Sequence, residues 1–284
     1  MRGNGIIVFA AARTGFCYTR GMSQPIIVET REQIVTLRVN RPRARNALNW
    51  AAQERFAAHI TRLAGERDVR ALIITGTGDS FISGGDLKEL ARQPDEEAGQ
   101  RLNDIMTGAL AQLVELPFPV IAAVNGHAVG GGCEVLTACD LRLGYDDVQL
   151  KWAQVHMGLT TGWGGAARLV RQVGQSRALE LLLTGRALSG QEALRLGILH
   201  RVVSREDDVH EAAFAWARSL ARLPREALAA LKQLVHALPQ LTPEEHVDYE
   251  RELFNRLWGR PDHLEALAAF LEKRRPSFGR DTAT

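Results

Sequence analysis

Several features that define other protein classes are scarce in this chain. Its three cysteines (Cys17, Cys133 and Cys139) fit neither a disulfide framework nor a zinc site, which suits a reducing, cytoplasmic compartment. Its eight histidines show no paired metal spacing, so we expect no metal ion. No apolar run is long enough to cross a membrane. With 35 basic and 33 acidic residues, near-neutral charge argues against nucleic acid or an anionic membrane as the main partner.

The length and composition predict a chain that buries a substantial core. Its 284 residues suffice for one large domain or for a core with an appendage, and 45% of them are hydrophobic. Residues 1–21 contain a short apolar run that only weakly resembles a secretory signal, so we expect a poorly ordered N-terminal extension. We expect the core over residues 22–206 and a helical subdomain over residues 207–284.

Residues 119–140 contain the pattern with the clearest chemical meaning. An apolar run, 120–124, is typical of a buried strand, and the glycine triplet 130–132 then opens a segment of helical composition. Glycines at a helix N-terminus leave backbone N–H groups free to hold an anion or a developing oxyanion. Glu134, one turn on, could act as a base beside that position. The alternative is that the glycines only permit close packing and Glu134 only favours the helix N-terminus.

The same arrangement of strand, glycines and helix occurs earlier in the chain. Residues 71–76 form a second apolar run, Gly84 and Gly85 follow, and a helix is expected from near Leu87. Two amides that converge on one carbonyl oxygen would form an oxyanion hole, in which each donor contributes about 2.7–4 kcal/mol of transition-state stabilisation. The repetition favours a functional site over simple packing and indicates repeated strand–helix units.

The remaining pattern gives a coarse order of elements. Residues 26–28 and 34–39 predict a β-hairpin, and apolar positions from 52 to 63 and from 102 to 113 predict two amphipathic helices. We expect an acidic loop over residues 94–99. From residue 207 the pattern is helical, with helix starts at Pro224, Thr242 and Pro261.

With these motifs in view, residues 26–278 resemble the crotonase, or enoyl-CoA hydratase/isomerase, superfamily. The resemblance rests on the order and spacing of Asn40-Arg41-Pro42, Asn46-Ala47-Leu48, Phe81 to Leu87, Asn125-Gly126, Gly130 to Glu134, Gly158 and Gly162 to Gly165. It implies an α/β fold, a crotonase-like spiral of ββα units with a C-terminal helical subdomain. It also implies a homotrimer or hexamer and coenzyme A as the substrate carrier, with no prosthetic group.

The resemblance also implies roles for individual residues. The oxyanion hole would use the amides of Gly85 and Gly131, with Glu134 as a catalytic carboxylate. Contacts to coenzyme A would come from a second set of positions, namely Arg43, Ala44, Arg45, Asp86, Lys88 and Arg280.

One position departs from the family pattern. Hydratases of this family use two glutamates, and the second would fall at Gln154. An amide cannot exchange a proton as a general acid or base, so a two-carboxylate hydratase is in doubt. His156 or His127 could take that role, although a single histidine is more often structural.

Further local similarity, in residues 137–143 and 162–170, is to the ethylmalonyl-CoA/methylmalonyl-CoA decarboxylase branch. Decarboxylation forms the enolate without deprotonating carbon, and a neutral Gln154 avoids a further like charge beside the substrate carboxylate. We therefore expect an enolate-forming acyl-CoA enzyme, with decarboxylation slightly favoured over hydration or double-bond isomerisation.

Two other kinds of function are weaker alternatives. The first is a non-catalytic member of the family that binds acyl-CoA or RNA; Gln154 favours it and the intact Gly85, Gly131 and Glu134 oppose it. The second is another enzyme class, either a dinucleotide-binding enzyme or a serine hydrolase. The G-x-G-x-x-G and G-x-S-x-G spacings of those enzymes are absent.

Overall fold

The computed structural model describes residues 24–92 and 94–279. The predicted extension, residues 1–21, therefore lies outside the described residues. Within the described ranges, no helix combines the length and the apolar character that crossing a bilayer requires.

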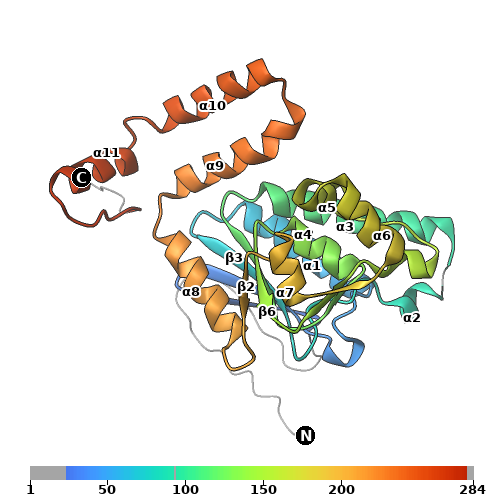
Figure 1. Cartoon of the computed structure of the whole chain (residues 1–284). Helices are drawn as coiled ribbons and strands as arrows, with labels where there is room; N and C mark the ends of the chain where they lie inside the picture. The colour runs from blue at the N-terminus through green and yellow to red at the C-terminus, as the bar shows by residue number, and fades with distance from the viewer. Residues whose placement is uncertain (1–23, 93, 280–284) are drawn as a thin grey trace, which may run out of the picture.

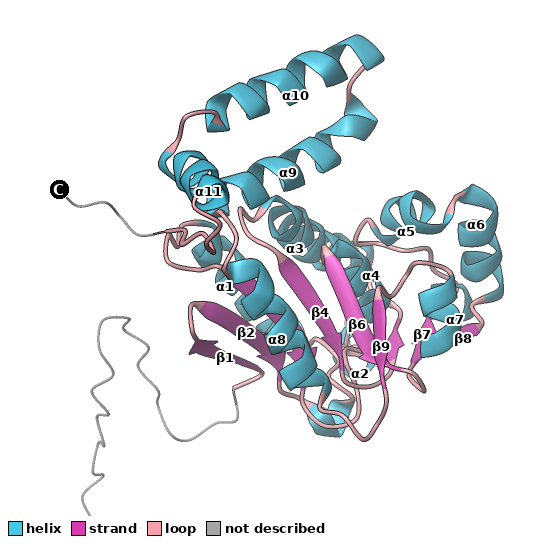
Figure 2. Ribbon diagram, turned by 60° about the vertical axis from the view of Figure 1, so that its left-hand side comes forward, coloured by secondary structure: helices cyan, strands magenta, loops and turns pink. Residues whose placement is uncertain are grey.

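A six-stranded sheet organises the first two thirds of the chain, in the order β1-β2-β3-β4-β6-β9 (Figure 2). The hairpin predicted at the start is confirmed, because β1 and β2 pair antiparallel, and the other pairs in this sheet are parallel. The strands are β1 Ile26–Arg31, β2 Ile34–Val39, β3 Ala71–Gly76, β4 Val120–Val124, β6 Leu141–Tyr145 and β9 Arg201–Val203.

Both faces of this sheet are buried. The apolar residues of β3 alternate between two hydrophobic clusters, with Leu72 and Ile74 in one and Ala71 and Ile73 in the other. The first cluster includes residues of α1 Trp50–Ala64, α3 Glu96–Glu115 and α4 Gly131–Ala138, and the second includes α8 Val209–Ala221. A parallel strand covered on both sides has a continuous apolar sequence, which is why residues 71–76 and 120–124 were recognisable as strands.

A small second sheet lies beside the first. Its order is β5-β7-β8, formed by β5 Ala128–Val129, β7 Gln149–Lys151 and β8 Ala187–Ser189. The shorter helices are η1 Pro42–Ala44, α2 Leu87–Leu90, η2 Ala153–Met157, α5 Gly165–Val173, α6 Gln175–Thr184 and α7 Gly190–Arg195.

The prediction of a loop over residues 94–99 is wrong in part. Helix α3 begins at Glu96, and the Asp95 side chain caps it by accepting a hydrogen bond from the backbone N–H of Ala98 at 2.8 Å. The acidic residues that suggested a loop are favoured in a first helical turn, because they oppose the positive end of the helix dipole.

The last three helices extend away from the sheet (Figure 1). They are α9 Arg225–Ala237, α10 Pro243–Leu257 and α11 Pro261–Leu271, and the short helix η3 Leu238–Gln240 joins the first two. We call residues 225–271 the appendage. The helical part predicted for residues 207–284 also includes α8, which packs on the sheet instead. The α/β class and the helical C-terminal region are confirmed.

Candidate functional site

Two asparagines join the loops at the carboxyl ends of neighbouring strands. Asn46, after β2, accepts from the Arg41 N–H at 2.9 Å and donates to the Ser80 carbonyl at 2.6 Å. Asn125, after β4, accepts from the Gly76 N–H at 3.0 Å and donates to the Gly78 carbonyl at 2.6 Å. The loops that follow β2, β3 and β4 are thus fixed to one another at the sheet edge where α/β proteins place their ligands.

The two glycine motifs meet at this edge. Gly84 has φ of +84°, and a Cβ atom there would lie 3.0 Å from the backbone nitrogen of Gly131. A Cβ at Gly132 would lie 1.8 Å from the Ile82 carbonyl oxygen. Side chains would therefore force the two loops apart, and glycine allows their backbones to touch.

The N–H groups of Gly85 and Gly131 are available to a ligand. Leu48 forms a parallel bridge to Gly85 through the Gly84 carbonyl, at 2.7 Å, and the Asp86 N–H, at 3.0 Å, so the polar groups of Gly85 itself face away from Leu48. Gly131 is the first residue of α4, so its N–H has no partner within the helix. Within residues 24–92 and 94–279, neither N–H donates a hydrogen bond.

The carboxylate of Glu134 is buried and surrounded by donors. Its Oε2 accepts from the backbone N–H groups of Trp163, at 2.8 Å, and Gly165, at 2.9 Å. Its Oε1 accepts from the Gly162 N–H at 3.3 Å and from Nε2 of Gln154 at 3.0 Å. Glu134 thus holds the turn that begins α5, and all four of its contacts treat it as an acceptor.

Gln154 occupies the position opposite Glu134. Its amide nitrogen contacts the Glu134 carboxylate, and its own Oε1 is buried without a hydrogen-bond partner among the described residues. A two-glutamate site needs its second carboxylic acid at this position. Here the position holds the amide of Gln154, which contacts the first glutamate, Glu134, directly.

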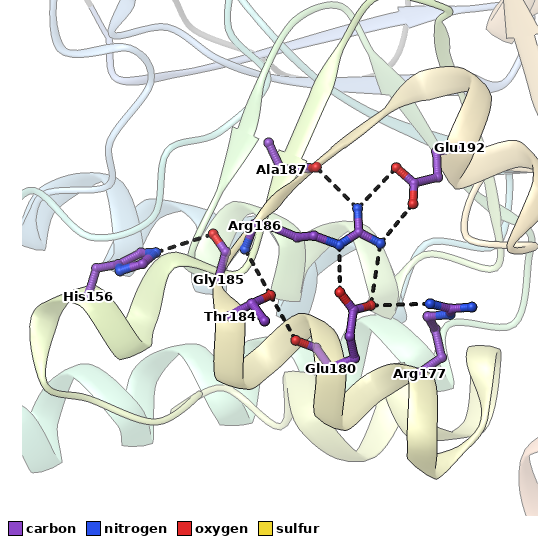
Figure 3. Close-up of polar contacts among 8 residues, drawn as sticks. All are labelled: His156, Arg177, Glu180, Thr184, Gly185, Arg186, Ala187 and Glu192. Atoms are coloured by element: carbon purple, nitrogen blue, oxygen red, sulfur yellow. Dashed lines mark hydrogen bonds and ion pairs between the residues drawn. The ribbon is translucent and has the colours of Figure 1, made fainter.

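Neither histidine considered as a substitute is hydrogen-bonded to Glu134. The His156 ring points to the carbonyl of Gly185, with Nε2 at 3.3 Å, beside the ion pairs of Arg186 with Glu180 and Glu192 (Figure 3). Nδ1 of His127 accepts the Gln149 N–H at 3.0 Å. Both rings have structural contacts elsewhere.

Of the predicted coenzyme A contacts, those in residues 43–45 and 86–88 lie on the Gly85 side of the site. Ser83 donates to the Ala44 carbonyl at 3.5 Å, which places the 43–45 turn against the first glycine loop. Arg43, Arg45 and Lys88 are exposed, and none of them forms an ion pair within the described residues. Arg280 lies outside the described residues.

Asp86 has a structural partner. It caps α2 through the Lys88 N–H at 3.2 Å and forms an ion pair with Arg41 at 2.8 Å. Burial by itself would raise the pKa of Asp86, but its hydrogen bonds and the Arg41 charge lower the pKa below the usual value. Asp86 therefore fixes the glycine loop as an anion.

Cys133, which precedes Glu134, is not a nucleophile in this site. The thiol is fully buried, and burial raises its pKa far above the ordinary value. Since the thiolate is the reactive form, covalent chemistry at this cysteine is disfavoured.

Sequence reasoning missed two residues that complete the site. Trp163 lies over Gly131, and Arg168 donates to the carbonyls of Trp163, at 2.6 Å, and Glu134, at 3.1 Å. The glycines at 162, 164 and 165 signalled a tight turn at this point. What the turn contacts depends on tertiary structure.

Comparison with known proteins identifies the family to which this α/β fold and these motifs belong. The family model described as Enoyl-CoA hydratase/isomerase matches residues 29–281. A probable enoyl-CoA hydratase of Mycobacterium tuberculosis is 34% identical over 90% of this chain and 98% of its own length. The ethylmalonyl-CoA decarboxylase of Gallus gallus is 36% identical over 81% of this chain and 78% of its own length.

Structural comparison agrees. The crystal structure of an enoyl-CoA hydratase from Bacillus anthracis has a TM-score of 0.85 at 33% identity, with 89% of this chain and 98% of that chain covered. The chain therefore belongs to the enoyl-CoA hydratase/isomerase family, and the predicted crotonase-like fold is confirmed.

Proposed function

We propose that this chain decarboxylates a malonyl-type acyl-CoA. The bond between the α-carbon and the carboxylate breaks, carbon dioxide leaves, and the electron pair passes to the thioester oxygen as an enolate. The amides of Gly85 and Gly131 would bind that oxygen, and removing one such donor typically costs about 2.7–4 kcal/mol of transition-state stabilisation. A proton then reaches the α-carbon, which yields the simple acyl-CoA.

The observation that carries this proposal is the contact between Gln154 and Glu134, 3.0 Å from Nε2 to Oε1. Hydration needs one group to activate water and another to handle the proton at the α-carbon, and a glutamine can do neither. Decarboxylation needs only one proton donor. It also gains from a neutral side chain beside the substrate carboxylate, where a second glutamate would repel it.

We assign the proton transfer to Glu134. In its protonated form Glu134 would give its proton to the α-carbon from Oε1, whose contact with the Gly162 N–H is the longest of the four, at 3.3 Å. A proton from water would then restore the acid. The three shorter contacts, at 2.8, 2.9 and 3.0 Å, would hold the carboxyl group in place during the transfer.

Coenzyme A would lie on the Gly85 side. Arg43, Arg45 and Lys88 offer exposed positive charge to its phosphates, with the Ala44 and Asp86 loops between them. Arg280 is a further candidate for a phosphate contact. A cytoplasmic location, where acyl-CoA thioesters are made and used, suits this function.

The reaction is tested by steady-state kinetics on methylmalonyl-CoA, ethylmalonyl-CoA and crotonyl-CoA. We expect release of carbon dioxide from a malonyl-type substrate, with kcat/KM well above that for hydration of crotonyl-CoA. Efficient turnover of crotonyl-CoA alone would show that the decarboxylase assignment is wrong.

Hydration is the second candidate, because the relatives include probable hydratases that align over 90% of this chain. A non-catalytic acyl-CoA- or RNA-binding role is the third. Turnover of any acyl-CoA in a broad screen would exclude the third without deciding between the first two.

Replacing Glu134 with glutamine tests the proton transfer. The glutamine oxygen can still accept from Trp163 and Gly165, and rotation of Gln154 can present its free Oε1 to the new amide. The turn should therefore persist while the acid is lost. We expect kcat to fall about 10²–10⁴-fold, with the Kd for a non-reactive acyl-CoA analogue changed little.

We also propose a homotrimer or hexamer. The appendage exposes large apolar side chains, including Phe270 (80%), Leu271 (78%) and Trp258 (62%), and exposed apolar patches of this kind mark protein interfaces. Light scattering on the purified chain is expected to give three or six times the monomer mass; a monomer at micromolar concentration would contradict the assembly.

A further inference from the structure

Trp163 lies directly against the second proposed oxyanion donor. A Cβ atom at Gly131 would lie 2.2 Å from Cζ3 and 2.4 Å from Cη2 of the Trp163 ring. The indole therefore occupies the place where any other residue at 131 would carry its side chain. Trp163 itself is 4% exposed.

The backbone that carries this ring is fixed on every side. The Gly162 and Trp163 N–H groups donate to Glu134 of α4, at 3.3 and 2.8 Å. The Gly162 carbonyl accepts from Thr107 of α3 at 3.1 Å, and the Trp163 carbonyl accepts from Arg168 of α5 at 2.6 Å. Side chains from three helices thus hold all four polar groups of this dipeptide, so the ring is a preorganised wall.

The side chains beside Gly85, the other proposed oxyanion donor, can move more easily. A Cβ at Gly85 would lie 2.9 Å from Cδ1 of Leu90 and 4.0 Å from Cδ1 of Leu102. Leucine side chains change rotamer readily, and Leu90 ends the four-residue helix α2. Of the two linings, the one at Gly131 is the rigid one.

The charges fix how a thioester would lie across this pair of donors. Arg43, Arg45 and Lys88, which form no ion pair with any described residue, are on the Gly85 side. The sulfur and the pantetheine chain would therefore extend toward that side. The acyl group then extends toward Gly131. A carbonyl oxygen about 2.9 Å from the Gly131 nitrogen would place the acyl group beside the glycine that the indole covers.

We propose that Trp163 sets the size of the acyl group, as a wall that admits short acyl chains and excludes long ones. This inference rests on the proposed acyl-CoA function and names the substrate class of that site, namely thioesters with compact acyl groups. Glu134 and Arg168 are positioning residues for the wall through their hydrogen bonds to its backbone. One methylene against a close-fitting wall changes kcat/KM by about 10–200-fold.

The experiment measures kcat/KM for two homologous series, alkylmalonyl-CoA and trans-2-enoyl-CoA, each with acyl chains from four to ten carbons. The wild-type enzyme is expected to lose activity steeply with chain length. Trp163→Ala should raise the ratio of long-chain to short-chain kcat/KM at least tenfold, and Trp163→Phe should raise it by a smaller factor. An unchanged ratio in both variants would overturn the inference.

Two controls separate a change in selectivity from damage to the fold. Phe56→Leu also removes buried aromatic volume but lies in α1, and it should leave the ratio as it is in the wild type. If Trp163→Ala does not fold, Trp163→Phe keeps an aromatic ring on Gly131 and still tests the direction. If the wild type turns over neither series, the proposed function fails; if it turns over a series and only the ratio does not move, this inference alone fails.

Discussion

The sheet core and the appendage bury their apolar residues to very different extents. Phe56, Phe81 and Phe118 in the core are between 0% and 1% exposed. In the appendage only Ala230, Leu253 and Ala269 are buried among the described hydrophobic residues, while Phe270 is 80% exposed. The core is complete within one chain, and the appendage has helices without a core of their own.

Local sequence is sufficient to explain the appendage helices. Thr242 and Glu245 form a reciprocal capping box at the start of α10, and Pro261 occupies the first turn of α11. Caps and prolines specify where a helix begins, but packing supplies most of its stability. The missing packing is the physical reason to expect a second copy of the chain against this surface.

The largest expected difference in stability is between a phenylalanine-to-alanine substitution in the core and the same substitution in the appendage. Phe56→Ala removes a fully buried ring and should lower the free energy of unfolding by about 3–5 kcal/mol. Phe270→Ala removes an exposed ring and should change the stability of the isolated monomer by less than about 0.5 kcal/mol. Urea unfolding of dilute protein measures both.

The same two variants should affect oligomer assembly in the reverse order. Phe270→Ala is expected to weaken the oligomer in sedimentation at micromolar concentration, while folded Phe56→Ala retains it. Equal effects of the two substitutions on monomer stability would contradict the division of the chain into a complete core and an incomplete appendage.

A largely buried ion pair connects the two regions. Nζ of Lys232, in α9, lies 2.7 Å from Oδ2 of Asp140 and 3.3 Å from the Phe118 carbonyl. These side chains are 11% and 18% exposed. Lys232→Met should lower the free energy of unfolding by about 1.5–3 kcal/mol, since it removes a largely buried hydrogen bond to a charged group.

Arg251→Met in α10 is the matched control for the Lys232 variant. Its ion pair with Asp248 has a similar distance, 2.7 Å, but the side chains are 63% and 76% exposed, and exposed pairs contribute about 0–1 kcal/mol. A comparable loss of stability in both variants would mean that the burial of the Lys232 ion pair does not strengthen the attachment of the appendage.

The smallest expected effect is a pH dependence of stability, which comes from His200, the residue before β9. Burial, and then the nearby Arg142 charge, lower the pKa of His200 to about 4. Because the unfolded chain binds this proton near pH 6.5 and the folded chain does not, stability should fall as pH decreases from about 6.5 toward 4. His200 is exposed, so solvent reduces the effect.

His200→Asn tests this dependence, because its oxygen can replace Nδ1 as the acceptor of the Arg142 N–H, which is 3.1 Å away. Chemical unfolding at a series of pH values should show a shallower loss of stability in the variant than in the wild type. Identical slopes would exclude His200 as a source of the acid sensitivity.

Much of the fold could be predicted from the sequence, because it follows from local or periodic patterns. The buried strands β3 and β4 are continuous apolar runs, and the glycines at 84–85 and 130–132 indicate where the chain must come close to something. The start of α3 could not be predicted correctly, because acidic residues are common in both loops and first helical turns.

The sequence by itself also determined that position 154 holds an amide and that Glu134 has no second glutamate in the family position. Only the tertiary structure decided what Glu134 contacts. Its four donors come from residues 20 to 31 positions away, and Trp163 lies against Gly131, which is 32 positions away. Helix periodicity and turn chemistry act over a few neighbouring residues, so long-range contacts of this kind exist only once the elements have packed.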